Sequence, residues 1–386
     1  MKLRFLFLIV LITSSCKTQD NNLYEFNPIA LVKDKITLTG IANDINYIPL
    51  DNKYPVNDVF NPKVTKNSIF LFTPNGIIAF NRNGGIARKI GNKGRGPEEY
   101  LYGSNFTVDV NHETVYVLDR DNLIKVYNSY GDYIKSIPLQ MDIGSPGLIE
   151  MYESKIFIAY FLQFNNAKYD WIILDTLGKI IRKKERSIPQ FTSNFGAGSG
   201  TYLSGKVLHY WNPYIDTIFS ILPDLSYKPS FTLSPGEHRL PKSNFNPGKP
   251  PNLIMHLRMI FETNRFWVIR YDYIRPIIAL VDKNSRKAFL SYIDKDNNSV
   301  KDENSGGILN DLDGGINFQP RGYFVEDGME YLIGLINPYQ IKAFVVSKEF
   351  INSTPKYSIK KKEFEKLANS LKETDNPVLV MVRLKK

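Results

Sequence analysis

The sequence repeats a glycine-containing turn at a fixed interval, and this repeat limits the fold more than any other feature. Gly84, Gly131 and Gly178 are separated by 47 residues and then by 47 again. Before Gly84 and Gly131 come a short apolar strand, a polar turn and a second strand, and a further strand follows each glycine. A period of this length built only from strands is typical of the blades of a β-propeller.

Weaker copies of the unit continue along the chain, in residues 218–233, 277–293 and 323–346. In the last copy we expect a hairpin followed by a third strand over residues 341–346, IKAFVV. The composition agrees, because 13% of the residues are aromatic, 25 are Gly and 22 are Pro, a balance that favours sheets and turns over a helical bundle.

The two ends of the repeat region suggest how the ring closes. Residues 45–50 and 378–384 both form apolar strand patterns, and pairing them in the last blade would remove an exposed sheet edge. The one helix we expect spans residues 361–373, where an apolar stripe recurs at helical spacing: Phe364, Leu367, Ala368 and Leu371. We therefore predict an all-β domain over residues 45–386, a six-bladed β-propeller with seven blades as the alternative.

The N-terminus carries an export signal. Residues 1–15 combine Lys2 and Arg4 with eight consecutive apolar residues and end in small residues, the pattern of a signal peptide. The single cysteine of the chain, Cys16, follows directly, and the arrangement resembles the lipobox of bacterial lipoproteins. We expect cleavage before Cys16, lipid attachment at its thiol, and a tether over residues 16–44. One cysteine also excludes an intrachain disulfide or a multi-cysteine metal site.

The net charge of +10 is spread along the chain. Its densest basic runs, residues 182–186 and 360–362, stand beside acidic residues, as on ordinary solvated surfaces. This dispersion argues against nucleic acid as a partner and is compatible with acidic glycans or lipid headgroups.

Three segments carry a family resemblance: IGNKGRGPEEYL at residues 90–101, GILNDLDGGINFQP at 307–320 and DNPVL at 375–379. With the opening strand they resemble the six-bladed β-propeller lipoproteins of Bacteroidota, relatives of NHL-repeat propellers. The resemblance implies a cell-envelope lipoprotein held in the outer membrane by its lipid, and leaves open whether it faces the periplasm or the surface.

Motifs with known chemistry are incomplete in this chain. The glycine-rich segment 90–101 lacks both the end of a P-loop and the third glycine of a dinucleotide fingerprint, so we interpret it as a crossing between blades that projects Arg95. The histidines lack close metal spacing, although a channel metal held by His209 or His256 is an alternative. Asp311 and Asp313 either hold a cation or sugar hydroxyls, or pin a turn.

The leading functional hypothesis is a non-catalytic binding module whose loop face recognises a glycan or a partner protein, because the loops of all blades converge on one face of a rigid ring. No catalytic residue, cofactor or metal is assigned. The alternative is a propeller lyase or hydrolase that uses a channel metal or the Asp311/Asp313 pair. Besides Arg95 and these two aspartates, the candidate ligand-binding residues come from loops 191–204 and 234–256 and their edges: Tyr202, His238, Arg239, His256 and Arg258.

Overall fold

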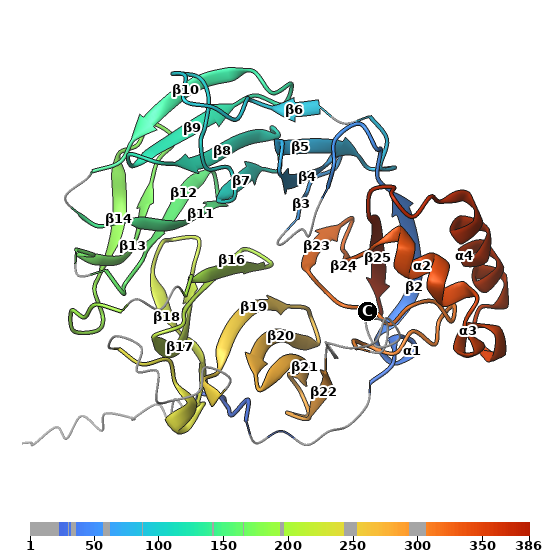
Figure 1. Ribbon diagram of the computed structural model, residues 1–386. Helices are drawn as coiled ribbons and strands as arrows, with labels where there is room; N and C mark the ends of the chain where they lie inside the picture. The colour runs from blue at the N-terminus through green and yellow to red at the C-terminus, as the bar shows by residue number, and fades with distance from the viewer. Residues whose placement is uncertain are drawn as a thin grey trace, which may run out of the picture.

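The protein is a six-bladed β-propeller. The computed structural model describes residues 23–29, 31, 36–56, 62–86, 88–140, 143–164, 166–193, 197–242, 253–292 and 306–386. Its strands form six antiparallel four-stranded sheets arranged around one axis, and one sheet gains a fifth strand (Figure 1). The predicted signal peptide and the lipid attachment site at Cys16 lie outside the described residues.

The first three blades follow one another without interruption, and each gives four strands in chain order. Blade 1 contains β3 (Lys63–Val64), β4 (Ser68–Thr73), β5 (Gly76–Asn81) and β6 (Arg88–Ile90). Blade 2 contains β7 (Phe106–Asp109), β8 (Thr114–Asp119), β9 (Leu123–Tyr127) and β10 (Tyr133–Pro138). Blade 3 contains β11 (Pro146–Tyr152), β12 (Lys155–Tyr160), β13 (Tyr169–Leu174) and β14 (Ile180–Glu185).

Of the last three blades, blades 4 and 6 include strands from the ends of the chain. Blade 4 contains β15 (Gly200–Ser204), β16 (Val207–Asn212), β17 (Ile215–Ile221), β18 (Tyr227–Leu233) and the N-terminal β1 (Glu25–Phe26). Blade 5 contains β19 (His256–Glu262), β20 (Phe266–Tyr273), β21 (Arg275–Asp282) and β22 (Ala288–Tyr292). Blade 6 contains β23 (Gly322–Glu326), β24 (Met329–Ile336), β25 (Val378–Leu384) and β2 (Ala42–Pro49).

The hydrophobic core is divided among the interfaces between blades. In β5, Ile78 and Phe80 pack toward blade 6, whereas Ile77 and Ala79 pack toward blade 2. Because successive side chains of a strand point to opposite faces, a strand between two neighbours must be apolar on both faces. The uninterrupted apolar runs in the middle strands of the blades follow from this arrangement.

The repeated turn glycines are required by the preceding blade. Gly131 has φ 97°, and a Cβ there would lie 2.1 Å from the carbonyl oxygen of Lys89. Its own carbonyl accepts a hydrogen bond of 2.9 Å from the N–H of Gly91, just after the outer strand of blade 1. A Cβ on Gly84 would likewise lie 2.1 Å from the carbonyl oxygen of Pro49. A left-handed backbone and this close approach both favour glycine, which explains the 47-residue period.

Both ends of the chain meet in blade 6. β2 pairs with β25 from Ala42–Leu384 to Pro49–Val378, and β25 pairs with β24. The last blade therefore takes its outer strand from near the N-terminus and its third strand from the C-terminus. The adjacent helix α1 (Leu38–Ile41) is buried through Leu38 and Ile41, so part of the segment we expected to be a tether packs on the ring.

The prediction of a third strand of blade 6 over residues 341–346 is wrong. Residues 341–345 belong to helix α2 (Pro338–Val345) and Val346 caps its end, and the third strand of this blade is β25 instead. The local reason is a capping box, in which the Asn337 and Gln340 side chains each bind the other residue's backbone N–H, with Pro338 at the first helical position. Helix α3 (Lys348–Asn352) follows, and neither helix was expected.

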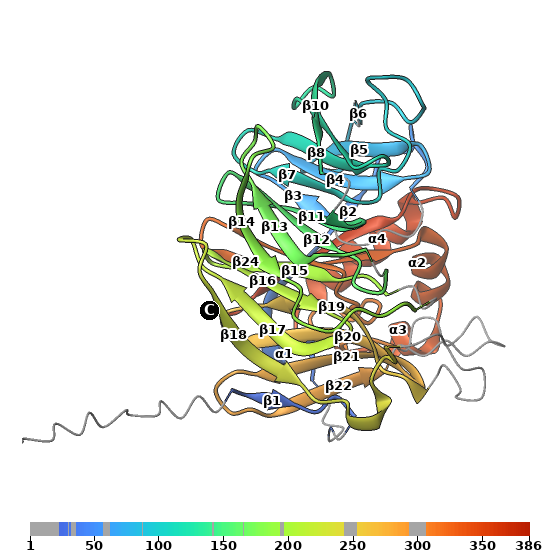
Figure 2. The same cartoon turned by 90° about the vertical axis from the view of Figure 1, so that its left-hand side faces the viewer.

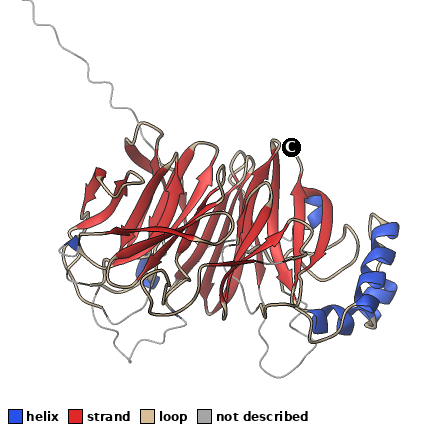
Figure 3. Ribbon diagram, turned by 90° about the horizontal axis from the view of Figure 1, so that it is seen from above, coloured by secondary structure: helices blue, strands red, loops and turns tan. Residues whose placement is uncertain are grey.

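The expected C-terminal helix is present as α4 (Ser358–Ser370), and its first turn begins three residues earlier than predicted. Its buried side chains, Phe364 and Ala368, lie on the predicted apolar stripe. The three helices form a layer beside the ring, outside its strands (Figure 3). Among the described residues, none of the helices is both long and apolar enough to cross a membrane.

The two faces of the ring differ because of the strand order. Turns between first and second strands and between third and fourth strands lie at one end, which we name the hairpin face. The opposite end, the long-loop face, carries the connections between blades and the turns between second and third strands. In blade 6 that second-to-third connection is the helical segment 337–377.

Candidate functional site

The candidate residues predicted from the sequence do not form a single site. Arg95, His238 and Arg239 lie on connections between blades, at the long-loop face. His256 and Arg258 belong to the first strand of blade 5, and Tyr202 to the first strand of blade 4. Asp311 and Asp313 lie on the connection between blades 5 and 6.

The connection between β6 and β7 holds Arg95 at its tip. The Tyr100 N–H donates to the Asn92 carbonyl and the Gly94 N–H to the Tyr100 carbonyl, at 3.1 and 3.0 Å. The Glu99 carboxylate accepts the N–H of Gly96 at 2.8 Å. Arg95 is exposed, and within the described chain its guanidinium makes no hydrogen bond or ion pair.

Blade 2 supports this loop from below. The ammonium group of Lys125 donates to the Pro97 carbonyl, and the Tyr127 hydroxyl donates to the Glu98 carbonyl at 2.8 Å. The Asp119 carboxylate accepts the N–H groups of Leu101 and Tyr102 at 2.9 and 3.0 Å. These contacts give an otherwise irregular loop a defined shape, so the exposed Arg95 is presented from a fixed support.

The glycines of this loop are there for packing. A Cβ on Gly94 would lie 2.0 Å from the Glu99 carboxylate, and one on Gly91 would lie 2.4 Å from the Tyr127 ring. The glycine-rich pattern that suggests phosphate binding thus arises from close backbone approach to neighbouring side chains. Our interpretation of this segment as a crossing between blades agrees with this geometry.

His238 and Arg239 lie beside a small pocket between blades 4 and 5. Arg239 forms an ion pair with Asp216 at the pocket rim, and burial raises the pKa of the Asp216 carboxyl although Arg239 opposes the shift. The His238 ring contacts the Leu253 carbonyl and the edge of Tyr273. The pocket volume is about 20 Å³, room for roughly one water molecule.

His256 and Arg258 stand at the start of β19. Arg258 forms an ion pair of 2.6 Å with Asp272 on the neighbouring strand β20. Burial lowers the pKa of His256, and the positive charge of Arg258 lowers it further. The guanidinium of Arg258 is thus occupied by an intrablade pair, in contrast to that of Arg95.

Asp311 and Asp313 hold chain segments in place. The Asp311 carboxylate accepts the backbone N–H of Thr39 at 2.7 Å and also the Thr39 hydroxyl. Asp313 is fully buried and accepts the N–H of Gly315 at 2.9 Å, and burial raises the pKa of its carboxyl. Asp313 thus supports a local turn, whereas Asp311 binds a segment far away in the sequence.

The segment that carries these aspartates fills the outer wedge between blades 5 and 6. Ile308, Leu312, Ile316 and Phe318 are buried in the same cluster as α1 and the helical layer. The Leu309 carbonyl accepts the Leu38 N–H at 2.9 Å. The motif GILNDLDGGINFQP therefore holds the N-terminal segment around α1 against the last blade.

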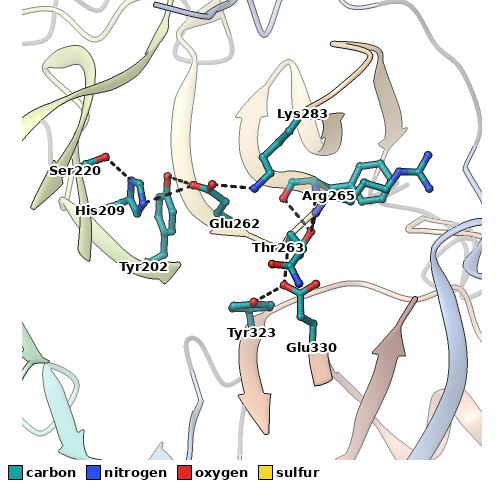
Figure 4. Close-up of polar contacts among 11 residues, drawn as sticks. Tyr202, His209, Ser220, Glu262, Thr263, Arg265, Lys283, Tyr323 and Glu330 are labelled. Carbon is teal, nitrogen blue, oxygen red and sulfur yellow. Dashed lines mark hydrogen bonds and ion pairs between the residues drawn. The ribbon is translucent and has the colours of Figure 1, made fainter. Parts of the chain in front are cut away.

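Tyr202 belongs to a buried polar cluster that the sequence analysis did not identify (Figure 4). Its ring stacks on that of His209 at 4.5 Å with 2° between the planes. Its hydroxyl donates to the Glu262 carboxylate of blade 5 at 3.3 Å. The Lys283 ammonium binds the same carboxylate at 3.0 Å.

Burial controls protonation in this cluster. Desolvation, reinforced by Glu262, raises the pKa of Tyr202 well above its usual value. Desolvation also lowers the pKa of His209 to about 4, against the attraction of Glu262. At neutral pH the stacked rings of Tyr202 and His209 are therefore uncharged.

Other acidic side chains join neighbouring blades in the same manner. Glu330 of blade 6 accepts the Asn264 N–H of blade 5 at 2.8 Å and the Tyr323 hydroxyl at 2.6 Å. Glu113 of blade 2 binds the Thr65 and Ser68 hydroxyls of blade 1. Such carboxylates have their acceptor sites occupied by the protein itself.

Glu150 joins more blades than any of these. Its carboxylate accepts the Thr107 hydroxyl of blade 2 at 2.7 Å and the Thr201 hydroxyl of blade 4 at 3.2 Å. It also forms an ion pair of 2.7 Å with Lys63 of blade 1. One signal in the sequence could have identified Glu150 and Glu262: each is a single acidic residue at the end or middle of an apolar strand.

The metal alternative gains no support from these arrangements. In the described ranges, no three His, Cys, Asp or Glu side chains are grouped so that they could hold a metal ion. His209 and His256, the histidines considered for a channel metal, lie on different blades.

The chain resembles solved structures of propellers. A crystal structure of a Bacteroides fragilis protein described as exported superposes with a TM-score of 0.65 at 18% identity, covering 94% of this chain and 99% of that one. A member of the DUF4221 family from Bacteroides vulgatus superposes with a TM-score of 0.50 at 11% identity, covering 89% and 97%. At these identities the likeness shows the shared fold.

None of the curated proteins matches the sequence. A family model described as a domain of unknown function, DUF4934, matches residues 26–383. That match spans the propeller from β1 to the end of β25, and the protein therefore belongs to the DUF4934 family.

Proposed function

We propose that the protein is a lipid-anchored envelope propeller whose long-loop face binds a glycan or a partner protein without catalysis. The observation that carries the proposal is the guanidinium of Arg95, which has no partner in the described part of the chain and stands on a loop supported by blade 2. A charged group held without an internal partner suits an external anionic or hydroxyl-rich ligand. The exposed Tyr102 on the same loop adds an aromatic surface.

The shape of the face favours a large ligand. Small-molecule sites in proteins commonly enclose roughly 300–1,000 Å³, whereas the pocket beside Arg239 encloses about 20 Å³. A glycan chain or a protein surface needs no deep cavity, because contacts spread over several loops can supply its affinity.

The envelope location rests on two supports. The N-terminal pattern ending at Cys16 resembles a lipoprotein signal, and the B. fragilis protein of similar fold is described as exported. We include in the proposal the resemblance to Bacteroidota lipoproteins and NHL-type propellers, and attachment to the outer membrane through a lipid on Cys16.

A retention experiment tests the proposal. The lipidated protein is immobilised, exposed to envelope extract, and compared with Arg95→Ala and Arg95→Lys. A charge-assisted contact contributes about 1.5–3 kcal/mol, so Arg95→Ala should lose roughly tenfold or more in affinity and Arg95→Lys should lose less. Arg182→Ala, an exposed arginine on the outer strand of blade 3, is the matched control.

The treatment of the extract identifies the ligand. Retention that protease abolishes indicates a protein, and retention that survives protease but not periodate indicates a glycan. Equal retention by Arg95→Ala and the native chain would refute the role of this loop. A Cys16→Ser chain that stays in the membrane fraction would refute the lipid anchor.

A further inference from the structure

The N-terminal segment is fastened to the outside of blades 4 and 5. β1 pairs in parallel with β18, with Glu25 opposite Thr232 and Phe26 opposite Leu233. Figure 2 shows β1 lying at the outer edge of the ring. The Thr232 and Ser234 N–H groups donate to the Tyr24 and Phe26 carbonyls, each at 2.9 Å.

Side chains strengthen this attachment. Phe26 is 1% exposed in the cluster between blades 4 and 5, and the Tyr271 hydroxyl donates to the Pro28 carbonyl at 2.6 Å. The Tyr24 ring stacks on Trp267, with 5.2 Å between centroids and 12° between planes. The guanidinium of Arg286 lies against both rings, 4.3 Å from the Tyr24 centroid and 5.3 Å from that of Trp267.

Arg286 adopts an unfavourable backbone conformation in making this contact. Its φ is 60°, in the left-handed region that costs a residue with a Cβ roughly 1–2 kcal/mol. In the corresponding turns of blades 1 to 3, the left-handed position is taken by Gly84, Gly131 and Gly178. Blade 4 has Leu225 in this position, with φ 65°, and blade 5 has Arg286, which contacts Tyr24.

We propose that this docked segment orients the anchored propeller, with the hairpin face of blade 4 toward a phospholipid bilayer and the long-loop face away from it. The inference rests on the proposed lipid at Cys16. It deepens the proposed function, since it leaves the Arg95 loop open to a ligand.

The number of residues between Cys16 and the docked segment limits how far the ring can lie from the membrane. Tyr24 lies eight positions after Cys16, and a fully extended chain of that length spans at most about 29 Å. Without docking, the first residue fixed on the ring would be Leu38 of α1, 22 positions after Cys16, and a chain of that length could span about 79 Å. Docking therefore shortens the reach of the anchor about threefold.

The direction of β1 determines which face of the propeller is turned toward the membrane. β18 runs from the turn after Ile221, on the hairpin face, to Leu233 at the long-loop face. Because β1 is parallel to β18, the chain preceding Glu25 arrives from the hairpin-face side.

The turns of the hairpin face suit a lipid surface. Tyr130 and Leu177 occupy the same position in the turns of blades 2 and 3, and they are 79% and 80% exposed. Tyrosine and leucine at exposed tips fit the boundary between headgroups and acyl chains, where amphipathic and apolar side chains are stable.

The test measures height above a membrane. The full lipidated chain is placed in vesicles of phosphatidylethanolamine and phosphatidylglycerol that contain an acceptor-labelled lipid. Since the native thiol of Cys16 is blocked by its lipid, an introduced cysteine takes the donor dye uniquely. The dye is placed at Lys206→Cys, on the hairpin face of blade 4, or at Lys93→Cys, on the long-loop face.

We expect stronger energy transfer from position 206 than from position 93, and loss of that difference in Tyr24→Ala/Phe26→Ser. Arg286→Gly is a second variant for the case in which the double substitution impairs folding. It relaxes the backbone at position 286 and removes the contact with Tyr24, so it should also reduce the difference in energy transfer. Phe164→Ala, which removes an aromatic side chain that is 43% exposed on blade 3, is the matched control and should keep the difference. Equal transfer in the native chain, or a difference that survives undocking, overturns the proposal.

The outcomes separate the two proposals. Absence of lipid from the N-terminal peptide by mass spectrometry overturns both the anchor and the orientation, and leaves the Arg95 ligand test standing. A lipidated chain with equal transfer at both positions overturns the orientation alone.

Discussion

The Lys63 ammonium group and the Glu150 carboxylate form an ion pair of 2.7 Å between the first strands of blades 1 and 3. The two residues do not belong to neighbouring blades, so the pair reaches past blade 2. Their side chains are 18% and 10% exposed, and Glu150 also binds hydroxyls of blades 2 and 4. One carboxylate thereby joins four of the six blades.

Removing this carboxylate should destabilise the ring. Breaking a buried ion pair by deleting one partner costs about 3–5 kcal/mol, so we expect Glu150→Ala to lower the free energy of unfolding by about 3 kcal/mol. Urea denaturation followed by fluorescence measures the change. Glu185→Ala is the control: its side chain is 75% exposed beside Lys183, and its loss should fall below about 1 kcal/mol. Equal losses would show that the Glu150 network contributes little.

Stability should fall in mild acid because of His209. Its folded pKa of about 4 lies below the ordinary value of 6.5, so between these values the unfolded chain binds a proton that the folded chain does not. The stabilisation is complete above pH 6.5 and is lost as the pH falls toward 4, by up to about 3 kcal/mol.

Unfolding midpoints measured across this pH range test the effect. His209→Phe keeps a ring against Tyr202 and removes the titration, so its midpoint should change less with pH. His112→Phe alters an exposed histidine and should keep the native slope. An unchanged slope in His209→Phe would contradict the assignment.

The turn glycines should differ in their tolerance of alanine. At Gly328, φ is 70° and no atom lies within 4 Å of an added Cβ, so Gly328→Ala should cost about 1 kcal/mol from backbone strain. At Gly131 the added Cβ also meets the Lys89 carbonyl at 2.1 Å, and the loss should be larger by about 2 kcal/mol or more. Thermal unfolding compares the two, and similar losses would argue against the contact between blades as the reason for the repeat.

Asp311 should stabilise the N-terminal segment around Thr39, just before β2. Asp311→Ala removes the acceptor for the Thr39 N–H and hydroxyl, so we expect faster proteolysis on the N-terminal side of Thr39 and a loss of about 1–2 kcal/mol in stability. N-terminal sequencing of limited digests locates the cleavage. Glu363→Ala, on the exposed face of α4, should digest like the native chain. A role of Asp311 in turnover would instead appear as lost glycan cleavage with native protease resistance.

The blades could be predicted from sequence because their information is local. Alternating burial, turn residues and the period of Gly84, Gly131 and Gly178 all lie within short stretches of chain. Residues 341–346 show where such information fails: an apolar run of this length fits a strand or a buried helix, and the Asn337–Gln340 capping box favours the helix. The sequence identified the glycine-rich segment 90–101 as a crossing between blades, but not why it needs glycines, which the Glu99 and Tyr127 side chains explain.

By itself the amino-acid sequence determined the repeating unit, the strand ends that close blade 6, and a pattern for export ending at Cys16. Only the tertiary structure decided which polar groups meet. Lys63 and Glu150 are 87 positions apart, and Tyr202 and Glu262 are 60 apart. No local pattern specifies such pairs, because ring closure sets the distance between blades and burial then requires each carboxylate to find a donor. Among the residues that the structure describes, the same closure left the Arg95 guanidinium without an acceptor.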